Sequence, residues 1–245
     1  MRNQTLLLCI SGIVLLMVVA AMTTGGSPRR SSPPPTSGLG ISGEAGRGTP
    51  LPSIAPLPAG TDVVAWAGQN SGRADIPERT LQAYAAAEID QRTRTPECGL
   101  SWVTLAGIGS VESNHATYRG ADLDHGGRVD PPIIGVALDG DGGTAAVPDS
   151  DGGRLDGDPG QDRAVGPMQF LPSTWATYGA DGNGDGVRDP QQIDDAALAA
   201  AGYLCAGGRD STSGSGWWSG VLAYNASSDY AREVWTAADR YAAAL

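Results

Sequence analysis

The sequence predicts a mainly α-helical domain with long Asp/Gly-rich loops, preceded by a disordered linker. Three observations lead to this prediction. Several segments repeat apolar residues at helical spacing, and no pair of alternating segments forms a convincing strand hairpin. Asp and Gly crowd residues 121–195, as is typical of loops. Gly, Pro, Ser and Thr dominate residues 25–60, which cannot bury enough apolar surface to fold.

The first helix that the sequence predicts covers residues 77–92. Pro77 suits a first helical turn, because its missing N–H would have no partner there. Apolar side chains then recur three or four residues apart, as on one face of a helix. They belong to Leu81, Tyr84, Ala85 and Ile89, with Glu88 on the same stripe.

Further helices are expected at 102–114, 172–178, 191–205, 217–226 and 229–244. Pro172 begins the second of these, and Gly207 and Gly208 stop the third. Asp229 is the expected N-cap of the last. Residues 131–138 read as a short extended piece within a long irregular region. The result is five or six helices around a loop-built cleft.

The N-terminal region is expected to lie outside this domain. Residues 5–22 form an 18-residue apolar run after Arg2, which indicates export. Its length fits either a cleaved signal peptide or an uncleaved membrane anchor. We therefore divide the chain into a signal or anchor at 1–24, a linker at 25–60 and a domain at 61–245. The protein is expected in the cell envelope or secreted, with membrane contact only through its N-terminal segment.

Charge is concentrated in one region of the chain. The net charge is -11, all 16 cations are Arg, and 40% of the 245 residues are hydrophobic. Residues 121–195 hold 15 Asp, no Glu and 4 Arg, so this stretch alone carries -11 and the rest is neutral. Such a chain has no basic surface for nucleic acid. The density of carboxylates suggests a bound cation, with a solvated acidic loop as the alternative.

Cys98 and Cys205 are the two cysteines that follow the export segment. In an exported domain two cysteines indicate one disulfide. It would close a loop of about 107 residues, for which the chain-entropy model gives about 4–5 kcal/mol as an upper figure. Two buried free thiols are the alternative.

Glu112 is the strongest candidate for a catalytic residue. In the helix expected at 102–114, Leu105, Ile108 and Val111 share a face with this carboxylate. A carboxylate on an apolar stripe costs free energy unless it is paired or used. Burial raises the pKa of such a group, as a general acid near neutral pH requires. The alternative is a buried Glu paired with an Arg.

Three short strings appear together with this residue. They are Ser-Val-Glu-Ser at 110–113, Gly-Pro-Met-Gln-Phe at 166–170 and Ala-Tyr-Asn at 223–225. Their order and intervals resemble the soluble lytic transglycosylase superfamily, and most closely its lytic transglycosylase B branch. The resemblance covers roughly residues 95–245. It implies a lysozyme-like fold and an activity on peptidoglycan glycan strands. We expect the protein to be a monomer.

The resemblance also implies roles for individual residues. Glu112 corresponds to the family's single catalytic acid and base. Ser113 would position the reacting sugar, Met168 and Gln169 would line the sugar subsites, and Tyr224 would hydrogen-bond and orient Glu112. Asn225 would contact substrate as well. Phe170 is the only Phe of the chain, and we interpret it as core packing.

The implied mechanism uses one carboxylate where ordinary glycosidases use two. The family's glutamic acid protonates the glycosidic oxygen between N-acetylmuramic acid and N-acetylglucosamine, then removes a proton from the muramic acid 6-hydroxyl, which closes a 1,6-anhydro ring. A second carboxylate from the Asp-rich region would make the protein a lysozyme-type hydrolase instead, and a non-catalytic glycan-binding domain is a further alternative. Asp162 and Arg163, next to the 166–170 turn, are expected to form an ion pair that supports it.

Residues 181–189 read Asp-Gly-Asn-Gly-Asp-Gly-Val-Arg-Asp and match the front of a calcium loop. Gln192 stands at position twelve in place of the usual Glu, so Asp194 or Asp195 would supply that carboxylate. The lytic transglycosylase B branch carries a calcium loop near this point. We expect a structural Ca2+ and no organic cofactor, with a metal-free cluster of Asx turns as the alternative. The expected ligands are Asp181, Asn183, Asp185, the Val187 carbonyl and Asp189.

Trp217 and Trp218 are neighbours, so one of them should face away from the helix core. An outward indole would provide a platform on which a sugar ring stacks. Core or interface positions for both are the alternative. The two histidines, His115 and His125, are interpreted as loop residues without a catalytic role.

Overall fold

The computed structural model describes residues 51–52, 55–140 and 145–245. This part of the chain is mainly helical, as predicted. The apolar run at 5–22 and most of the linker lie outside the described residues. Among the helices that the structure describes, none is both long enough and apolar enough to cross a bilayer. The helices are α2 (Val63–Ala74), α3 (Glu78–Arg94), α4 (Trp102–Ser113), α5 (Pro172–Tyr178), α6 (Ile193–Cys205), α7 (Gly214–Tyr224) and α8 (Ser228–Ala244).

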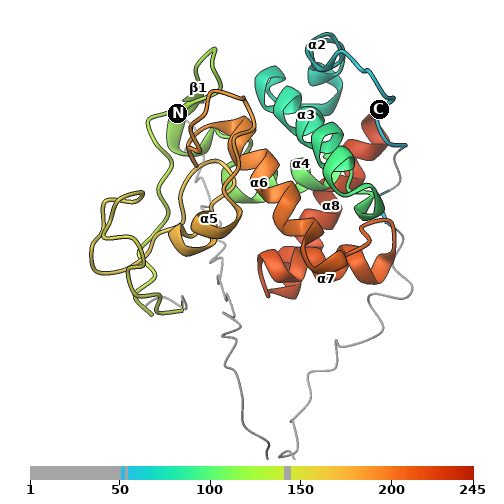
Figure 1. The fold of residues 1–245 in the computed structure, drawn as a ribbon. Helices are drawn as coiled ribbons and strands as arrows, with labels where there is room; N and C mark the ends of the chain where they lie inside the picture. The colour runs from blue at the N-terminus through green and yellow to red at the C-terminus, as the bar shows by residue number, and fades with distance from the viewer. Residues whose placement is uncertain (1–50, 53–54, 141–144) are drawn as a thin grey trace, which may run out of the picture.

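The helix α4 lies inside the bundle, where it contacts α3, α6 and α8 (Figure 1). Its residues from Trp102 to Gly109 are all buried. Gly107 and Gly109 permit this close packing, because a Cβ at either position would collide with Val234 on α8 or with the Tyr84 hydroxyl on α3. The helix that carries Glu112 is therefore held on several sides by the core.

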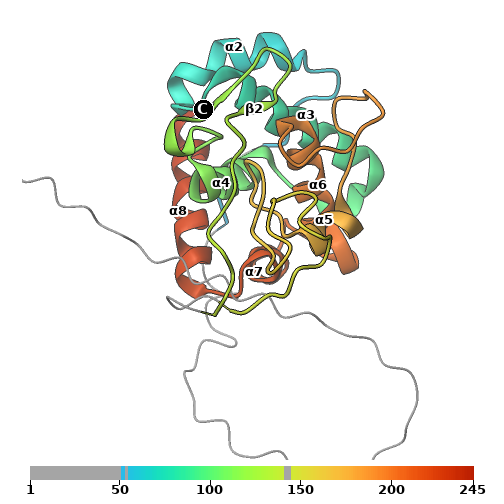
Figure 2. The same ribbon diagram turned by 90° about the vertical axis from the view of Figure 1, so that its left-hand side faces the viewer.

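The irregular region between α4 and α5 lies on one side of the bundle (Figure 1), and in the turned view it passes in front of α4 and α7 (Figure 2). It contains one small hairpin that the sequence reading missed, in which β1 (Asp122–Leu123) pairs antiparallel with β2 (Val129–Asp130). Residues 131–138 are not a strand, although Ile134 forms an isolated bridge with Val165. Strands this short carry too little periodicity to be found in a sequence.

Several helix boundaries differ from the predicted ones. The helix α2 was not predicted, although Asp62 is its N-cap and accepts the N–H groups of Val64 and Ala65. The helix α7 begins at Gly214, three residues before the expected start. Ser227, rather than Asp229, caps α8, because its hydroxyl accepts the Tyr230 N–H. Asp229 lies in the first turn and pairs with Arg232.

The last residues of the predicted linker pack on the domain. Leu57 is buried, and its N–H donates to Glu88 Oε1 at 2.8 Å. Its carbonyl accepts Arg92 Nη1, also at 2.8 Å. The other Glu88 oxygen accepts the Trp102 N–H at 2.9 Å, so one buried carboxylate joins the chain entering the domain to the start of α4. The folded part therefore includes residues that we had assigned to the linker.

The expected disulfide between Cys98 and Cys205 is present, with a Cα–Cα distance of 5.5 Å. Cys98 ends a short 3-10 helix (Pro96–Cys98) just before α4, and Cys205 is the last residue of α6. The bond joins the entrance of the Glu112 helix to the end of α6.

Candidate active site around Glu112

Glu112 lies in the last turn of α4 and is half-buried. The Tyr230 hydroxyl, from the first turn of α8, donates to Glu112 Oε1 at 2.6 Å. Burial raises the pKa of the Glu112 carboxyl to about 7, although the Tyr230 hydrogen bond lowers it. Among the described residues no arginine forms an ion pair with Glu112. The alternative of a structural Glu–Arg pair therefore finds no support.

The partner of Glu112 differs from the predicted one. The Tyr224 hydroxyl donates to the Met168 carbonyl at 2.7 Å, and Tyr230 takes the place expected for Tyr224. Tyr224 is the last residue of α7, and its ring packs edge-on against Phe170. Burial and then the nearby Glu112 charge raise the pKa of both tyrosines.

Residues 166–170 form a closed turn beside the end of α4. The N–H and carbonyl groups of Val165 and Phe170 pair with each other at 2.8 and 3.0 Å. Gly166 takes a positive φ of 77°, and a Cβ there would meet the Pro190 carbonyl. Gln169 also has a positive φ, 50°, and its amide donates to the Gly166 carbonyl at 2.9 Å. The turn is therefore held rigidly in one conformation.

Ser113 joins this turn to α4. Its hydroxyl donates to the Pro167 carbonyl at 2.7 Å and accepts the Ala116 N–H at 2.9 Å. Ser113 and Met168 are both buried. The three sequence strings therefore meet in space, because Ser113 and Tyr224 both donate to backbone carbonyls of the turn. The turn lies against the end of the helix that carries Glu112.

Of the residues expected to touch substrate, Gln169 is the one that keeps part of its side chain exposed, and Ser113, Met168, Tyr224 and Asn225 are buried. Asn225 follows α7, and its side-chain oxygen accepts the Ser227 N–H at 3.0 Å. Its amide nitrogen is buried and has no hydrogen-bond partner among the described residues.

Two expectations near the site are wrong. Asp162 and Arg163 do not pair with each other, since Asp162 accepts the Ser150 N–H and hydroxyl, and Arg163 pairs with Asp158. Trp217 and Trp218 are both buried, at 3% and 8% exposure, so neither offers a platform for a sugar. Trp217 donates to Thr104 on α4.

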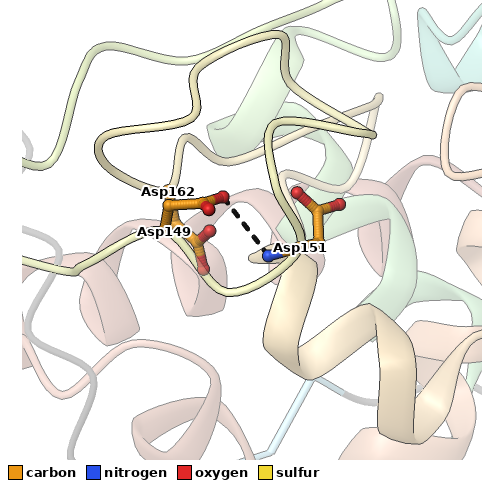
Figure 3. A group of neighbouring side chains, drawn as sticks. All are labelled: Asp149, Asp151 and Asp162. Atoms are coloured by element: carbon orange, nitrogen blue, oxygen red, sulfur yellow. Dashed lines mark hydrogen bonds between the residues drawn. The ribbon is translucent and has the colours of Figure 1, made fainter.

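Three carboxylates of the Asp-rich region come together in the structure (Figure 3). Asp149, Asp151 and Asp162 bring ligand oxygens within 4.8 Å of one another. Backbone N–H groups of the same loop donate to all three, including Gly152 to Asp149 and Leu155 to Asp151. These donors account for the arrangement without a metal ion.

The carboxylates of the predicted calcium loop do not form such a group among the described residues. Asp181 and Asp185 accept N–H groups of their own loop, and Asp189 pairs with Arg128. Asp195 is buried and accepts the N–H groups of Gly182 and Asp189. Asp194, the other residue considered for position twelve, pairs with Arg79 on α3.

Comparison with known protein families supports a lytic transglycosylase-type assignment. The model of a family described as "Transglycosylase SLT domain" matches residues 162–219. This segment contains the 166–170 turn, α5, α6 and half of α7, whereas Glu112 and Tyr230 lie outside it. No curated protein and no solved structure matches the chain.

Proposed function

We propose that the protein is an exported peptidoglycan lytic transglycosylase, of the B branch, with Glu112 as its single acid and base. The observation that supports this most strongly is the state of Glu112. It is a half-buried carboxyl with a pKa raised to about 7, held by a tyrosine and by no arginine of the described residues. The family match at residues 162–219 supports the same class of activity.

In the proposed reaction, protonated Glu112 gives its proton to the glycosidic oxygen between N-acetylmuramic acid and N-acetylglucosamine. The bond from that oxygen to the anomeric carbon breaks, and N-acetylglucosamine leaves with a new hydroxyl. The Glu112 carboxylate then accepts the proton of the muramic acid 6-hydroxyl, whose oxygen closes onto the anomeric carbon. Glu112 ends protonated again and no water is consumed, so a pKa near 7 suits both steps.

The surrounding residues have supporting roles in this proposal. Tyr230 donates to Glu112 and fixes its orientation. Gln169 contacts the glycan, because it keeps exposed surface on the turn. Ser113 and Tyr224 hold that turn through its Pro167 and Met168 carbonyls.

A structural Ca2+ at residues 181–189 is a second part of the proposal. Burial raises the pKa of Asp195 to about 6, and the charges of Asp181 and Asp185 act in the same direction. Carboxylates that repel one another in this way fit a site for a divalent cation, which would neutralise them. Asp181, Asn183, Asp185 and the Val187 carbonyl would hold the ion, together with Asp195. Asp189 would have to leave Arg128 to join them.

The test is the mass of the products released from purified peptidoglycan by the full-length protein, by Glu112→Gln and by a matched control, Glu97→Gln. Glu97 is an exposed glutamate before α4. We expect anhydro-muropeptides from the first and the third, and none from Glu112→Gln. Products one water heavier would identify a hydrolase, and glycan binding without any product would identify a binding domain.

A further inference from the structure

The chain leaves α4 through a left-handed turn that no glycine supports. Asn114, His115 and Ala116 have φ values of 51°, 61° and 72° in succession. Non-glycine residues disfavour this region, and Ala gains nothing there from a polar side chain. A run of such residues persists only where its surroundings enforce it. The turn begins two residues after Glu112, so whatever enforces it also acts on the end of that helix.

Backbone hydrogen bonds account for part of this enforcement. The His115 N–H reaches back to the Gly109 carbonyl at 2.9 Å, and the Thr117 N–H donates to the Ser113 carbonyl at 3.1 Å. The His115 carbonyl accepts the buried Thr80 hydroxyl of α3 at 3.2 Å.

The His115 side chain supplies the remaining anchor. It is 4% exposed and lies between Tyr84 of α3 and Tyr241 of α8, which are 0% and 1% exposed. His115 Nε2 lies 2.7 Å from the Tyr241 hydroxyl, and Nδ1 lies 3.3 Å from the Tyr84 hydroxyl. One imidazole thus joins the turn to both helices that flank α4. His115 lies in a turn, as expected for a loop residue, but its side chain is buried.

Burial, together with a neighbouring charge, determines the protonation state of the ring. Arg240 donates to the Tyr241 oxygen at 2.8 Å, which leaves the Tyr241 hydrogen free to bond His115 Nε2. The Nδ1 hydrogen then points to Tyr84. Burial, and then the Arg240 charge, lower the pKa of His115 to about 4. The imidazole is therefore neutral at neutral pH and bonded at both nitrogens.

Ser113 transmits the position of the turn to the site. Its hydroxyl accepts the N–H of Ala116, the last left-handed residue, and donates to the Pro167 carbonyl. We propose that His115 is a positioning residue for Glu112, whose imidazole, clamped between Tyr84 and Tyr241, holds the left-handed turn 114–116 and with it the end of α4. This inference rests on the proposed function only in taking Glu112 as the reacting group.

The test compares His115→Gln and Tyr241→Phe with a control, His125→Gln, in the full-length protein. His125 is exposed on the β1–β2 hairpin. The pKa of the Glu112 carboxyl is measured by carbon NMR, with Glu112→Gln identifying the resonance, and kcat and KM are measured on peptidoglycan strands. In both test variants the pKa of Glu112 falls from about 7 toward its ordinary value, because a relaxed turn admits water. The kcat falls about tenfold or more with KM little changed, and the control keeps the wild-type values.

A Glu112 pKa that stays at about 7 in both test variants overturns the proposal, whatever happens to the melting temperature. Such a result would make His115 a core residue and nothing more. Tyr241→Phe keeps the aromatic ring and decides the matter if His115→Gln does not fold. A wild-type protein without activity whose Glu112 pKa still moves in the variants would refute the proposed function and leave the positioning role intact.

Discussion

Replacing Tyr230 with Phe removes one hydroxyl and tests the environment of Glu112. That hydroxyl donates to Glu112 Oε1 at 2.6 Å, and it lowers the pKa of the carboxyl against the effect of burial. Hydrogen bonds to charged groups contribute about 1.5–3 kcal/mol. Because proton donation by Glu112 in the proposed reaction leaves a carboxylate behind, the transition state would lose part of this stabilisation in Tyr230→Phe. We expect kcat to fall roughly 10- to 100-fold.

The pH dependence of activity should shift in a definite direction in this variant. In the proposed reaction catalysis begins from protonated Glu112, so activity is expected to decline as pH rises through its pKa of about 7. Without the Tyr230 hydroxyl the charged form is less stable, the pKa rises further, and the basic limb of the kcat profile moves to higher pH. The pKa of Glu112 is thus expected to rise in Tyr230→Phe and to fall in His115→Gln. The two variants therefore distinguish the loss of a hydrogen bond to the carboxylate from the entry of water around it.

The assay is the initial rate of anhydro-muropeptide release from purified peptidoglycan between pH 5 and 9, a range of about two pH units on either side of the wild-type pKa. Tyr118→Phe is the matched control, since Tyr118 is 44% exposed. A basic limb that stays in place or moves to lower pH in Tyr230→Phe, or an unchanged kcat, would refute the assigned role of Tyr230.

Three further predictions concern stability. Glu112→Gln should stabilise the fold by about 1–3 kcal/mol above pH 7 and leave it unchanged below pH 4. The reason is that folding raises the pKa of Glu112 from 4.5 to about 7, so the wild type loses stability as pH rises through this range. Urea unfolding at both pH values checks this. Replacing Cys98 and Cys205 with Ser should lower the free energy of unfolding by up to about 4–5 kcal/mol. A wild-type melting temperature that does not change when the disulfide is reduced would contradict this prediction. Calcium should raise the melting temperature of the wild type and not of Asp181→Asn, and equal melts with calcium and with chelator would exclude the ion.

The sequence predicted helices best where apolar spacing and stop signals agreed. Residues 172–178 have Pro172 at their start, and α5 has those same bounds. The helix α2 escaped prediction because it directly follows the Gly/Pro/Ser-rich linker and half of its residues are exposed, including Val64 at 54%. The cap at Asp62 was a signal that could have revealed it.

The sequence predicted which short strings form the candidate site but not the contacts between them. The strings bring Glu112 and the 166–170 turn together as expected, yet the tyrosine in the third string bonds a backbone carbonyl of that turn. Tyr230 reaches Glu112 because the chain reverses after α7 and begins α8 beside the end of α4. This contact depends on tertiary packing, which short sequence strings do not encode. The burial of both Trp217 and Trp218 was also not predictable from local sequence. It results from the contacts of α7 with α6 and α8 and from the hydrogen bond of Trp217 to α4.

The central claim, that one carboxyl at position 112 cleaves the glycan without water, is tested most directly by digesting peptidoglycan in water enriched in heavy oxygen. The account predicts muramic acid ends that carry no heavy oxygen, and no release of fragments by Glu112→Gln. One heavy oxygen incorporated at each new reducing end would contradict it, and would show that a water molecule attacks the anomeric carbon in place of the 6-hydroxyl.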